Sequence, residues 1–207
     1  LVASFSDPLY VNSGEILLYP KGFTTMGYER VFSDERLLSG YMNTLIYTVG
    51  GTALGVFCSL LSGYALSRRD LPGRGILMGI MVFTMYFGGG LVPTYLVVQR
   101  LNLINTRWIV ILMGSISVYN IILIRSFFQS SLSLELQEAA SIDGCGNIRF
   151  FFQIALPLSK AIVAVMALYL AVGYWNSYFT PMIYLTDAKK YPLPIFLREI
   201  LITSKPS

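Results

Sequence analysis

Long stretches without any charged residue alternate along this chain with short segments that carry its charges. The four longest uncharged stretches lie between Arg36 and Arg68, between Arg74 and Arg100, between Arg107 and Arg125, and between Lys160 and Asp187. Three of the four exceed the roughly 20 apolar residues that a helix needs to cross the hydrocarbon core of a bilayer. This pattern indicates a membrane protein.

We expect four membrane spans, at about residues 41–67, 76–98, 108–128 and 161–185. A backbone in lipid has to satisfy its own hydrogen bonds, so runs of this length predict helices and an all-α integral membrane protein. The three glycines at residues 88–90 lack the Gly-Lys-Ser/Thr that completes a phosphate-binding loop. They therefore indicate a kink or a close-packing site within the second span.

Small residues recur at every fourth position of the first span, where a helix places them along one ridge. They are Gly51, Gly55, Ser59, Gly63 and Ser67. Small residues at this spacing let a second backbone approach closely, so van der Waals packing can hold helices together in lipid. The ridge is interpreted either as static packing inside the bundle or as a face that slides against a partner helix.

Composition supports a membrane protein, because 55% of the residues are hydrophobic and only 13% are charged, against about 25% in soluble domains. The net charge of +4 is expected to reflect topology and an anionic lipid surface rather than nucleic-acid binding. The absence of histidine removes the usual zinc motifs and the commonest general base. Cys58 and Cys145 fall in a span and in a loop, so neither a disulfide nor a metal site is expected.

Arg68, Arg69 and Arg74 form the densest basic cluster beside a span, and the positive-inside rule places this cluster in the cytoplasm. Alternation then places residues 129–160 in the cytoplasm, within a transmembrane core of residues 41–185. Residues 1–40 are expected to be the end of a truncated span and an extracytoplasmic connector. Residues 186–207 are expected to be an extracytoplasmic loop before a missing last span, although Lys189 and Lys190 then lie outside against the rule.

The segment between the third and fourth spans carries signals for a short helix of its own. Ser133 can cap this helix, and Glu135 and Glu138 place negative charge in its first turns, where the helix dipole favours it. Gly144 suits a left-handed turn that ends the helix. Pro157 precedes the fourth span and permits a sharp entry angle.

The same segment holds a spaced motif: Glu138-Ala139-Ala140, three residues, Gly144, nine residues, Ile154, one residue, Leu156 and Pro157. It resembles the EAA signature of permeases of binding-protein-dependent ABC importers. Three flanking motifs are similar to the carbohydrate-uptake branch, namely Asn43-Thr44, Tyr64-Ala65-Leu66 with Ser67-Arg68, and Trp175-Asn176. The resemblance covers nearly all of the chain. It implies a polytopic helical bundle of the type I importer permease kind, with four complete spans of an expected six.

The resemblance implies a non-catalytic, multi-pass permease subunit of an ATP-driven oligosaccharide importer in the bacterial cytoplasmic (inner) membrane. Its implied partners are a second related permease, two cytoplasmic ATPase subunits, an extracytoplasmic sugar-binding protein and membrane lipid, but no nucleic acid. The ATPases would bind ATP and Mg, so no cofactor is expected in this chain. The residues implied to couple the chain to an ATPase are Glu138, Ala139, Ala140, Asp143, Gly144, Ile154, Leu156 and Pro157.

Polar and aromatic residues inside the spans are candidates for a substrate path. They are Tyr119, Asn120, Tyr174, Trp175, Asn176 and Tyr178. Sugars stack an apolar ring face on an aromatic and bind amides and hydroxyls without needing charge, so this set suits a sugar path. The alternative is that these side chains pack and form hydrogen bonds between helices.

No Asp, Glu, Lys or His occurs inside the four expected spans, and Arg125 lies near the end of the third, where it can snorkel to the interface. Many ion-coupled transporters keep ionisable residues there, so energy is expected from elsewhere. A secondary transporter driven by an ion gradient and an ABC importer permease for a non-sugar solute remain alternatives. A membrane enzyme is disfavoured by the lack of histidine and of paired carboxylates in the spans.

Overall fold

The computed structural model describes residues 5–6, 19, 22–25, 28–29 and 33–203, and the regular elements in these ranges are helices apart from one β-bridge between Ser6 and Phe23. The all-α class predicted from hydropathy is confirmed. Residues 1–4, which prompted the expectation of a truncated span, lie outside the described residues. The helices are α3 (Glu35–Ser67), α4 (Arg74–Tyr86), α5 (Leu91–Arg100), α6 (Arg107–Ser115), α7 (Val118–Ser131), α8 (Leu134–Ile142), α9 (Asn147–Phe150), the π-helix η2 (Phe151–Ala155), α10 (Leu156–Leu158), α11 (Lys160–Trp175), α12 (Phe179–Tyr184), the 3-10 helix η3 (Ala188–Lys190) and α13 (Leu193–Thr203).

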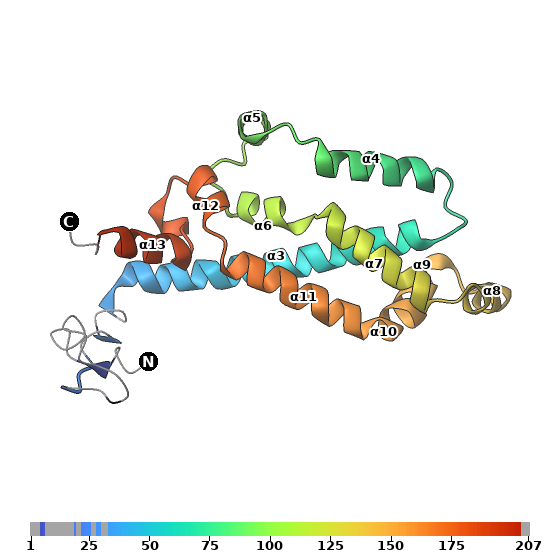
Figure 1. The fold of residues 1–207 in the computed structure, drawn as a ribbon, viewed down its shortest axis with the longest axis horizontal. Helices are drawn as coiled ribbons and strands as arrows, with labels where there is room; N and C mark the ends of the chain where they lie inside the picture. The colour runs from blue at the N-terminus through green and yellow to red at the C-terminus, as the bar shows by residue number, and fades with distance from the viewer. Residues whose placement is uncertain (1–4, 7–18, 20–21, 26–27, 30–32, 204–207) are drawn as a thin grey trace.

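Helix α3 runs along the length of the molecule, and α6, α7, α11 and α13 pack against it (Figure 1). It begins at Glu35, because the Asp34 side chain accepts a hydrogen bond of 2.9 Å from the Arg36 backbone N–H and caps the helix. Hydrogen bonds from the Arg36 guanidinium also hold the pKa of Asp34 below its ordinary value. At 33 residues, α3 is longer than the span of residues 41–67 that hydropathy predicts.

The small-residue ridge of α3 faces helices of the same chain. A Cβ added at Gly51 would lie 2.2 Å from the Tyr174 ring, and one at Gly63 would lie 2.5 Å from Ile124. At Gly55 it would lie 2.9 Å from both a Leu170 methyl and the Ser115 carbonyl oxygen. The ridge therefore brings the backbones of α6, α7 and α11 close to α3, as expected of small residues in a membrane bundle.

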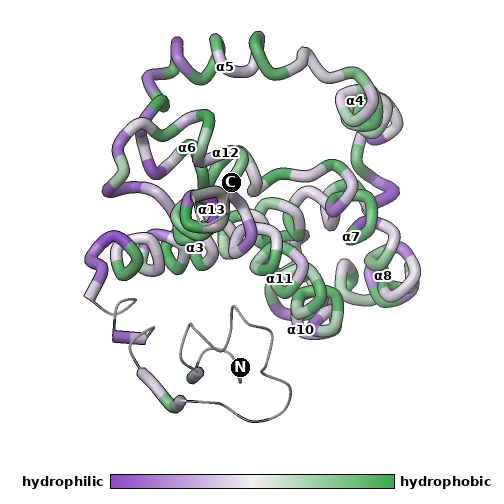
Figure 2. The backbone as a smooth tube through the Cα atoms, turned by 60° about the vertical axis from the view of Figure 1, so that its left-hand side comes forward, coloured by the Kyte–Doolittle hydropathy of each residue, from purple (hydrophilic) through white to green (hydrophobic). Residues whose placement is uncertain are grey.

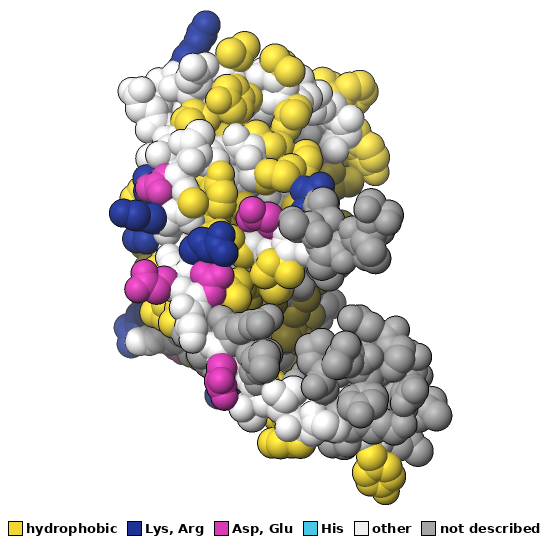
Figure 3. All heavy atoms as spheres, turned by 90° about the vertical axis from the view of Figure 1, so that its left-hand side faces the viewer, with side chains coloured by type: hydrophobic (Ala, Val, Ile, Leu, Met, Phe, Trp, Pro, Cys, Tyr) yellow, Lys and Arg dark blue, Asp and Glu magenta, His cyan; other side chains and the backbone are white. Residues whose placement is uncertain are grey.

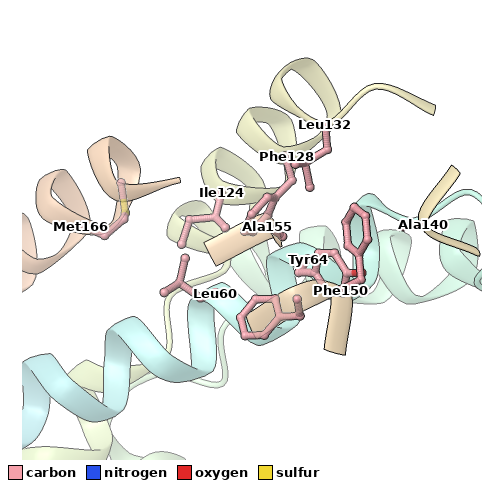
Figure 4. Packing of buried hydrophobic residues seen from close by; sticks show 10 residues of the cluster. Leu60, Tyr64, Ile124, Phe128, Leu132, Ala140, Phe150, Ala155 and Met166 are labelled. Atoms are coloured by element: carbon pink, nitrogen blue, oxygen red, sulfur yellow. The ribbon is translucent and has the colours of Figure 1, made fainter. Parts of the chain in front are cut away.

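Buried hydrophobic residues form two clusters, one toward each end of the bundle. One cluster lies where α3, α7 and the segment after α8 meet, and its labelled members include Leu60, Tyr64, Ile124, Phe128 and Phe150 (Figure 4). The other cluster joins α3 to α6 and α12 and consists of Tyr47, Val98, Ile109, Val110, Ile111, Tyr184 and Leu185. We call the end with α8, α9 and α10 the EAA end, and the end with α12, η3 and α13 the distal end.

The kink predicted at the glycines of the second span is confirmed, whereas the break in the third span was not predicted. Helices α4 and α5 meet at 114° and helices α6 and α7 at 47°. The first break falls at the predicted glycines, where Gly90 has a φ of +85° that only glycine adopts without strain. At the second break, Ile116 and Ser117 have extended backbone. Within the described residues α3 alone could cross a membrane, or up to four spans exist if each bent pair is one span.

The fourth span also differs from the prediction, because α11 ends at Trp175 rather than at residue 185. Both the backbone N–H and the side-chain Nδ2 of Asn176 donate to the Val172 carbonyl oxygen, at 3.2 and 2.8 Å. A straight continuation would also lack a hydrogen bond at Pro181, which has no N–H. At its other end α11 meets the Asn147–Leu158 helical segment at 81°, which confirms the sharp entry predicted from Pro157.

Helices α4 and α5 stand apart from the bundle and form what we call the outer arm (Figures 1 and 2). No residue of α4 is buried, and Val98 is the buried residue of α5. Phe83, Tyr86 and Val92 are 58%, 73% and 66% exposed. Such a continuous apolar surface is unusual for a soluble monomer and suits a setting of lipid or of another chain.

Side chains of α3 hold the chain at the distal end by binding its backbone. Asn43 donates to the carbonyl oxygens of Lys189 and Tyr191 at 2.7 and 3.1 Å, and the Tyr47 hydroxyl donates to that of Lys190 at 2.7 Å. Within residues 186–207, expected to be an extracytoplasmic loop, the helix α13 begins at Leu193. Figure 3 views this end and shows charged side chains of both signs on its face.

We expect Gly63→Ala to destabilise the fold by about 1–3 kcal/mol, because the added methyl group would force a tightly packed contact apart. Its Cβ would lie 3.1 Å from the backbone nitrogen of Arg125, which cannot swing away. Gly79→Ala in α4 is the matched control, since no atom lies within 4 Å of that position. Alanine is the better helix former, so the control should be neutral or stabilising by up to about 1 kcal/mol. Thermal unfolding in detergent measures both, and equal midpoints would contradict the close approach at Gly63.

Candidate functional site

The EAA segment, residues 129–160, contains a short helix with both ends defined by side chains or glycine. The Ser133 hydroxyl accepts a hydrogen bond of 3.2 Å from the Leu136 N–H at the start of α8, which confirms the predicted cap. Gly144 has a φ of +73° and ends the helix as predicted. The N–H groups of Gly144 and Cys145 donate to the carbonyl oxygens of Ser141 and Ala140, at 3.1 and 2.8 Å. This is the Schellman arrangement, which leaves few free carbonyls at the helix end.

The structure divides the eight predicted coupling residues into an outer and an inner group. The outer group is exposed and consists of Glu138, Ala139, Asp143, Gly144 and Pro157. The inner group faces the EAA-end core, where Ala140 and Ala155 are 8% and 0% exposed. Ile154 and Leu156 are partly buried against the same core. The signature therefore supplies both a surface and the contacts that seat this surface on the bundle.

The exposed surface of α8 combines apolar and acidic side chains. Ile142 is 87% exposed and Leu134 is 45% exposed, while Glu135, Glu138 and Asp143 lie among the exposed residues. Ile148, just after the turn, is 77% exposed and was not among the predicted residues. A large apolar side chain held out on a capped helix next to charges is suited to contact with another protein.

A second candidate site is a cavity of about 640 Å³ that opens to the surface of the chain, since Val165, Leu168 and Tyr169 of its lining are 57%, 67% and 63% exposed. It lies beside the break between α6 and α7 and the end of α11. Its lining residues are uncharged: Val110, Gly114, Ser117, Asn120, Val165, Leu168, Tyr169, Leu170, Val172, Gly173, Tyr174, Ser177 and Thr180. The volume falls within the range of about 300–1,000 Å³ that small-molecule sites occupy.

Asn120 is the most informative residue of this cavity. Its side chain is 1% exposed, and its Oδ1 atom has no hydrogen-bond partner among the described residues. An unpaired buried acceptor costs about 1–3 kcal/mol, so such groups in native structures require a reason. The Tyr174 hydroxyl, in contrast, donates to the Ile111 carbonyl oxygen at 2.5 Å. Tyr174 is thereby fixed in place, while Asn120 keeps a free acceptor beside the cavity.

The structure separates the six residues predicted to form a substrate path. Asn120 and Tyr174 line the large cavity. Trp175 and Asn176 line a different cavity of about 260 Å³. The ring of Tyr178 lies under the Arg198 guanidinium, 5.2 Å from its carbon, and Tyr119 is 54% exposed outside both cavities.

The large cavity also carries the hydroxyl groups of Ser117, Ser177 and Thr180, and of these three residues sequence reasoning missed Thr180. Two of them sit at helix breaks, since Ser117 precedes α7 and Ser177 follows α11. The breaks themselves were not predicted at these positions. Within the described part of the chain, no group of three or more Cys, Asp or Glu side chains could hold a metal ion.

The basic link between α3 and α4 lies at the EAA end. Arg69 and Arg74 line one pocket together with Ser133, Leu134 and Gln137 of the EAA segment. Next to them, the Arg68 guanidinium donates two hydrogen bonds to the Asp70 carboxylate, at 2.8 and 2.9 Å. These hydrogen bonds hold the pKa of Asp70 below its ordinary value. The predicted basic cluster and the EAA segment therefore share one side of the molecule.

Known proteins resemble this chain over almost its full length. Residues 51–191 match the family described as binding-protein-dependent transport system inner membrane component. The chain is 43% identical over 204 residues to the polygalacturonan/rhamnogalacturonan transport system permease protein YtcP of Bacillus subtilis, covering 99% of this chain and 71% of that protein. It is 41% identical over 204 residues to protein LplC of Bacillus subtilis, with coverage of 99% and 69%.

Among solved structures, the chain resembles one from the crystal structure of a bacterial ABC transporter involved in the import of the acidic polysaccharide alginate. The TM-score is 0.93 at 31% sequence identity, and the match covers 99% of this chain and 72% of that one. The bends of the helices are therefore compatible with the architecture of an importer permease.

Asn120→Leu is expected to raise the thermal unfolding midpoint, because it keeps the side-chain volume and removes a buried unpaired acceptor worth about 1–3 kcal/mol. Tyr174→Phe at the same cavity is the control and should lower the midpoint, because it leaves the Ile111 carbonyl oxygen without its partner. Both variants are compared with the native chain in the same detergent. A lower midpoint for Asn120→Leu would mean that its Oδ1 atom is paired in the folded protein.

Proposed function

Since the chain belongs to the binding-protein-dependent transport system inner membrane components, as an ABC importer permease subunit, we propose that it forms part of an oligosaccharide path and is driven through its EAA segment. The family predicted from the EAA signature is confirmed by the match of residues 51–191. The observation that carries the proposal is the two-sided packing of this segment. Its outer residues are free for another protein, while Ala140 and Ala155 join it to the bundle.

The proposed partner at the EAA segment is one of two cytoplasmic ATPase subunits, which bind ATP and Mg. Contact with an ATPase calls for apolar side chains that insert into a groove and for charges that fix the register. Ile142 supplies the first, and Glu138 and Asp143 supply the second. The neighbouring Arg69 and Arg74 support a cytoplasmic location for this end, because basic residues favour that side.

The other proposed partners would contact the outer arm and the distal end. The chain would form a heterodimer with a second related permease in the bacterial inner membrane. This permease would cover the apolar surface that lipid does not cover. An extracytoplasmic sugar-binding protein would contact the distal end. The chain would cross the membrane several times, with α3, the bent pairs α4–α5 and α6–α7, and α11 as its spans.

The large cavity supports an oligosaccharide as cargo. YtcP is named for polygalacturonan and rhamnogalacturonan transport, and the solved structure is that of an alginate importer. The amide of Asn120 and the hydroxyls of Ser117, Ser177 and Thr180 can bind sugar hydroxyls, and the rings of Tyr169 and Tyr174 can stack on a sugar face. All lining residues are uncharged, so the contacts from this chain suit sugar hydroxyls rather than carboxylates. No observation favours an ion-driven transporter or a non-sugar cargo.

Gly144→Arg is expected to leave the chain in the membrane and to uncouple ATP hydrolysis from uptake. The substitution strains a left-handed backbone, at about 1–2 kcal/mol, and adds a bulky charge to the proposed ATPase contact. Gly73→Arg is the matched control, because Gly73 also has a positive φ, of +72°, and no atom within 4 Å of an added Cβ. Uptake and ATP hydrolysis are measured on the assembled transporter in proteoliposomes. Normal uptake by the Gly144 variant would contradict the coupling role.

Asn120→Leu is expected to weaken oligosaccharide binding to the assembled permease and ATPase complex by about 3–10-fold, the equivalent of one neutral hydrogen bond. The binding protein is left out, so that the measured affinity belongs to the membrane complex. Tyr119→Leu, at the neighbouring exposed position outside the cavity, should bind as the native complex does. Unchanged affinity for the Asn120 variant would remove this cavity from the path and leave the coupling proposal untouched.

A further inference from the structure

One side chain of α3 reaches into the EAA segment from the side opposite to its exposed surface. Tyr64 is 6% exposed and belongs to the EAA-end core (Figure 4). Its ring stacks on Phe150 with centroids 6.3 Å apart and an interplanar angle of 20°. It also lies against Phe151, with centroids 5.0 Å apart. Phe150 and Phe151 follow the turn that ends α8, so these contacts bind the segment to α3.

The Tyr64 hydroxyl adds a polar contact to the same segment. It donates a hydrogen bond of 3.4 Å to the carbonyl oxygen of Asn147, the first residue of α9. Arg68, one turn further along α3, donates to the Tyr64 hydroxyl at 3.5 Å while its guanidinium is held by Asp70. Both hydrogen bonds to Tyr64 are long, so the hydroxyl orients the ring and the aromatic contacts supply most of the attachment.

The end of α3 around Tyr64 is itself firmly fixed. Arg125 of α7 donates to the Leu66 carbonyl oxygen at 3.1 Å, and Arg74 donates to that of Arg68 at 3.3 Å. The last carbonyls of a helix have no partner within the helix, and cations near them are favourable. Phe128 of α7 closes the cluster edge-on to Tyr64, with centroids 5.7 Å apart. Tyr64 therefore lies at a firmly held end of α3 and points into the EAA segment, which the ATPase is proposed to move.

We propose that Tyr64 is a positioning residue that transmits displacement of the EAA segment to α3, an inference that rests on the coupling role proposed above. Packed interiors transmit strain because they contain few voids, so moving α9 moves the stacked rings and α3 together. In its middle α3 backs the cavity, where Gly51 lies against the Tyr174 ring and Gly55 against a Leu170 methyl group. One rigid helix thus joins the proposed ATPase contact to the cavity wall.

The test measures the number of ATP molecules hydrolysed per sugar imported by the complete transporter in proteoliposomes. Tyr64→Met keeps a large flexible apolar side chain and removes the ring, so the core stays filled. We expect this ratio to rise about fivefold or more, which corresponds to the low end of coupling between sites. Tyr64→Phe restores the stacking and should stay within about twofold of the native ratio, since it loses only a weak hydrogen bond.

Tyr47→Met is the matched control for a purely structural effect. Tyr47 is also a buried α3 tyrosine, 1% exposed, and its hydroxyl also donates to a backbone carbonyl, that of Lys190. It lies at the distal end, so its substitution should lower thermal stability without changing the ATP-to-sugar ratio. Equal ratios for the Tyr64→Met and Tyr47→Met variants would overturn the proposal.

Two further measurements distinguish a failure of the Tyr64 proposal from a failure of the coupling role of the EAA segment. Phe150→Leu removes the ring on the other side of the contact and should raise the ATP-to-sugar ratio as Tyr64→Met does. It therefore tests the same contact if the Tyr64→Met variant fails to assemble. The double variant should raise the ratio no further, because both substitutions remove one shared contact, whereas additive effects would contradict the proposal. If Gly144→Arg remains coupled, the coupling role itself fails. If Gly144→Arg uncouples and the Tyr64 and Phe150 variants do not, only the role of Tyr64 fails.

Discussion

Close backbone approach along the glycine ridge of α3 is the contact on which the rest of this structure depends. In lipid, helices gain little from burying apolar surface against each other, so they associate where small residues allow dense packing. The Tyr174 ring lies over Gly51, the Ser115 carbonyl over Gly55 and the Ile124 side chain over Gly63. These three contacts set the positions of α11, α6 and α7. The cavity and the EAA segment are both built on helices placed in this way.

The helix breaks determine where polar groups meet the cavity. A break within a membrane span leaves backbone groups unpaired unless neighbouring parts of the protein cover them. At the break between α6 and α7, the flanking Ser115 and Asn120 are each 1% exposed, whereas Ile116 between them is 63% exposed. The same geometry brings Ser117 and Asn120 to the cavity wall. An uncharged lining with amide and hydroxyl groups is then a consequence of bending helices in lipid without burying charge.

Local signals in the sequence predict those parts of the fold that local chemistry decides. Ser133 and Gly144 bound α8 as predicted, because a cap and a left-handed turn depend on the residue itself. Hydropathy locates the four spans but cannot reveal that α11 stops at Trp175, since a hydrophobic run has the same composition whether straight or bent. The path residues show the same limit. Tyr119 and Asn120 are neighbours in sequence, yet tertiary packing exposes one and buries the other.

The two ends of α3 are attached by contacts of different kinds, and this difference matters for transport. At the distal end, Asn43 and Tyr47 bind backbone carbonyls through short, directional hydrogen bonds, which fix the register of the chain there. At the EAA end, Tyr64 is held mainly by aromatic faces, which resist compression but are less selective for direction. A push on α9 would therefore reach α3 through the aromatic contact at the EAA end, while the distal hydrogen bonds keep the chain in register there. The middle of the helix, where Gly51 and Gly55 lie against Tyr174 and Leu170 of the cavity wall, is the part that displacement from the EAA end would reach.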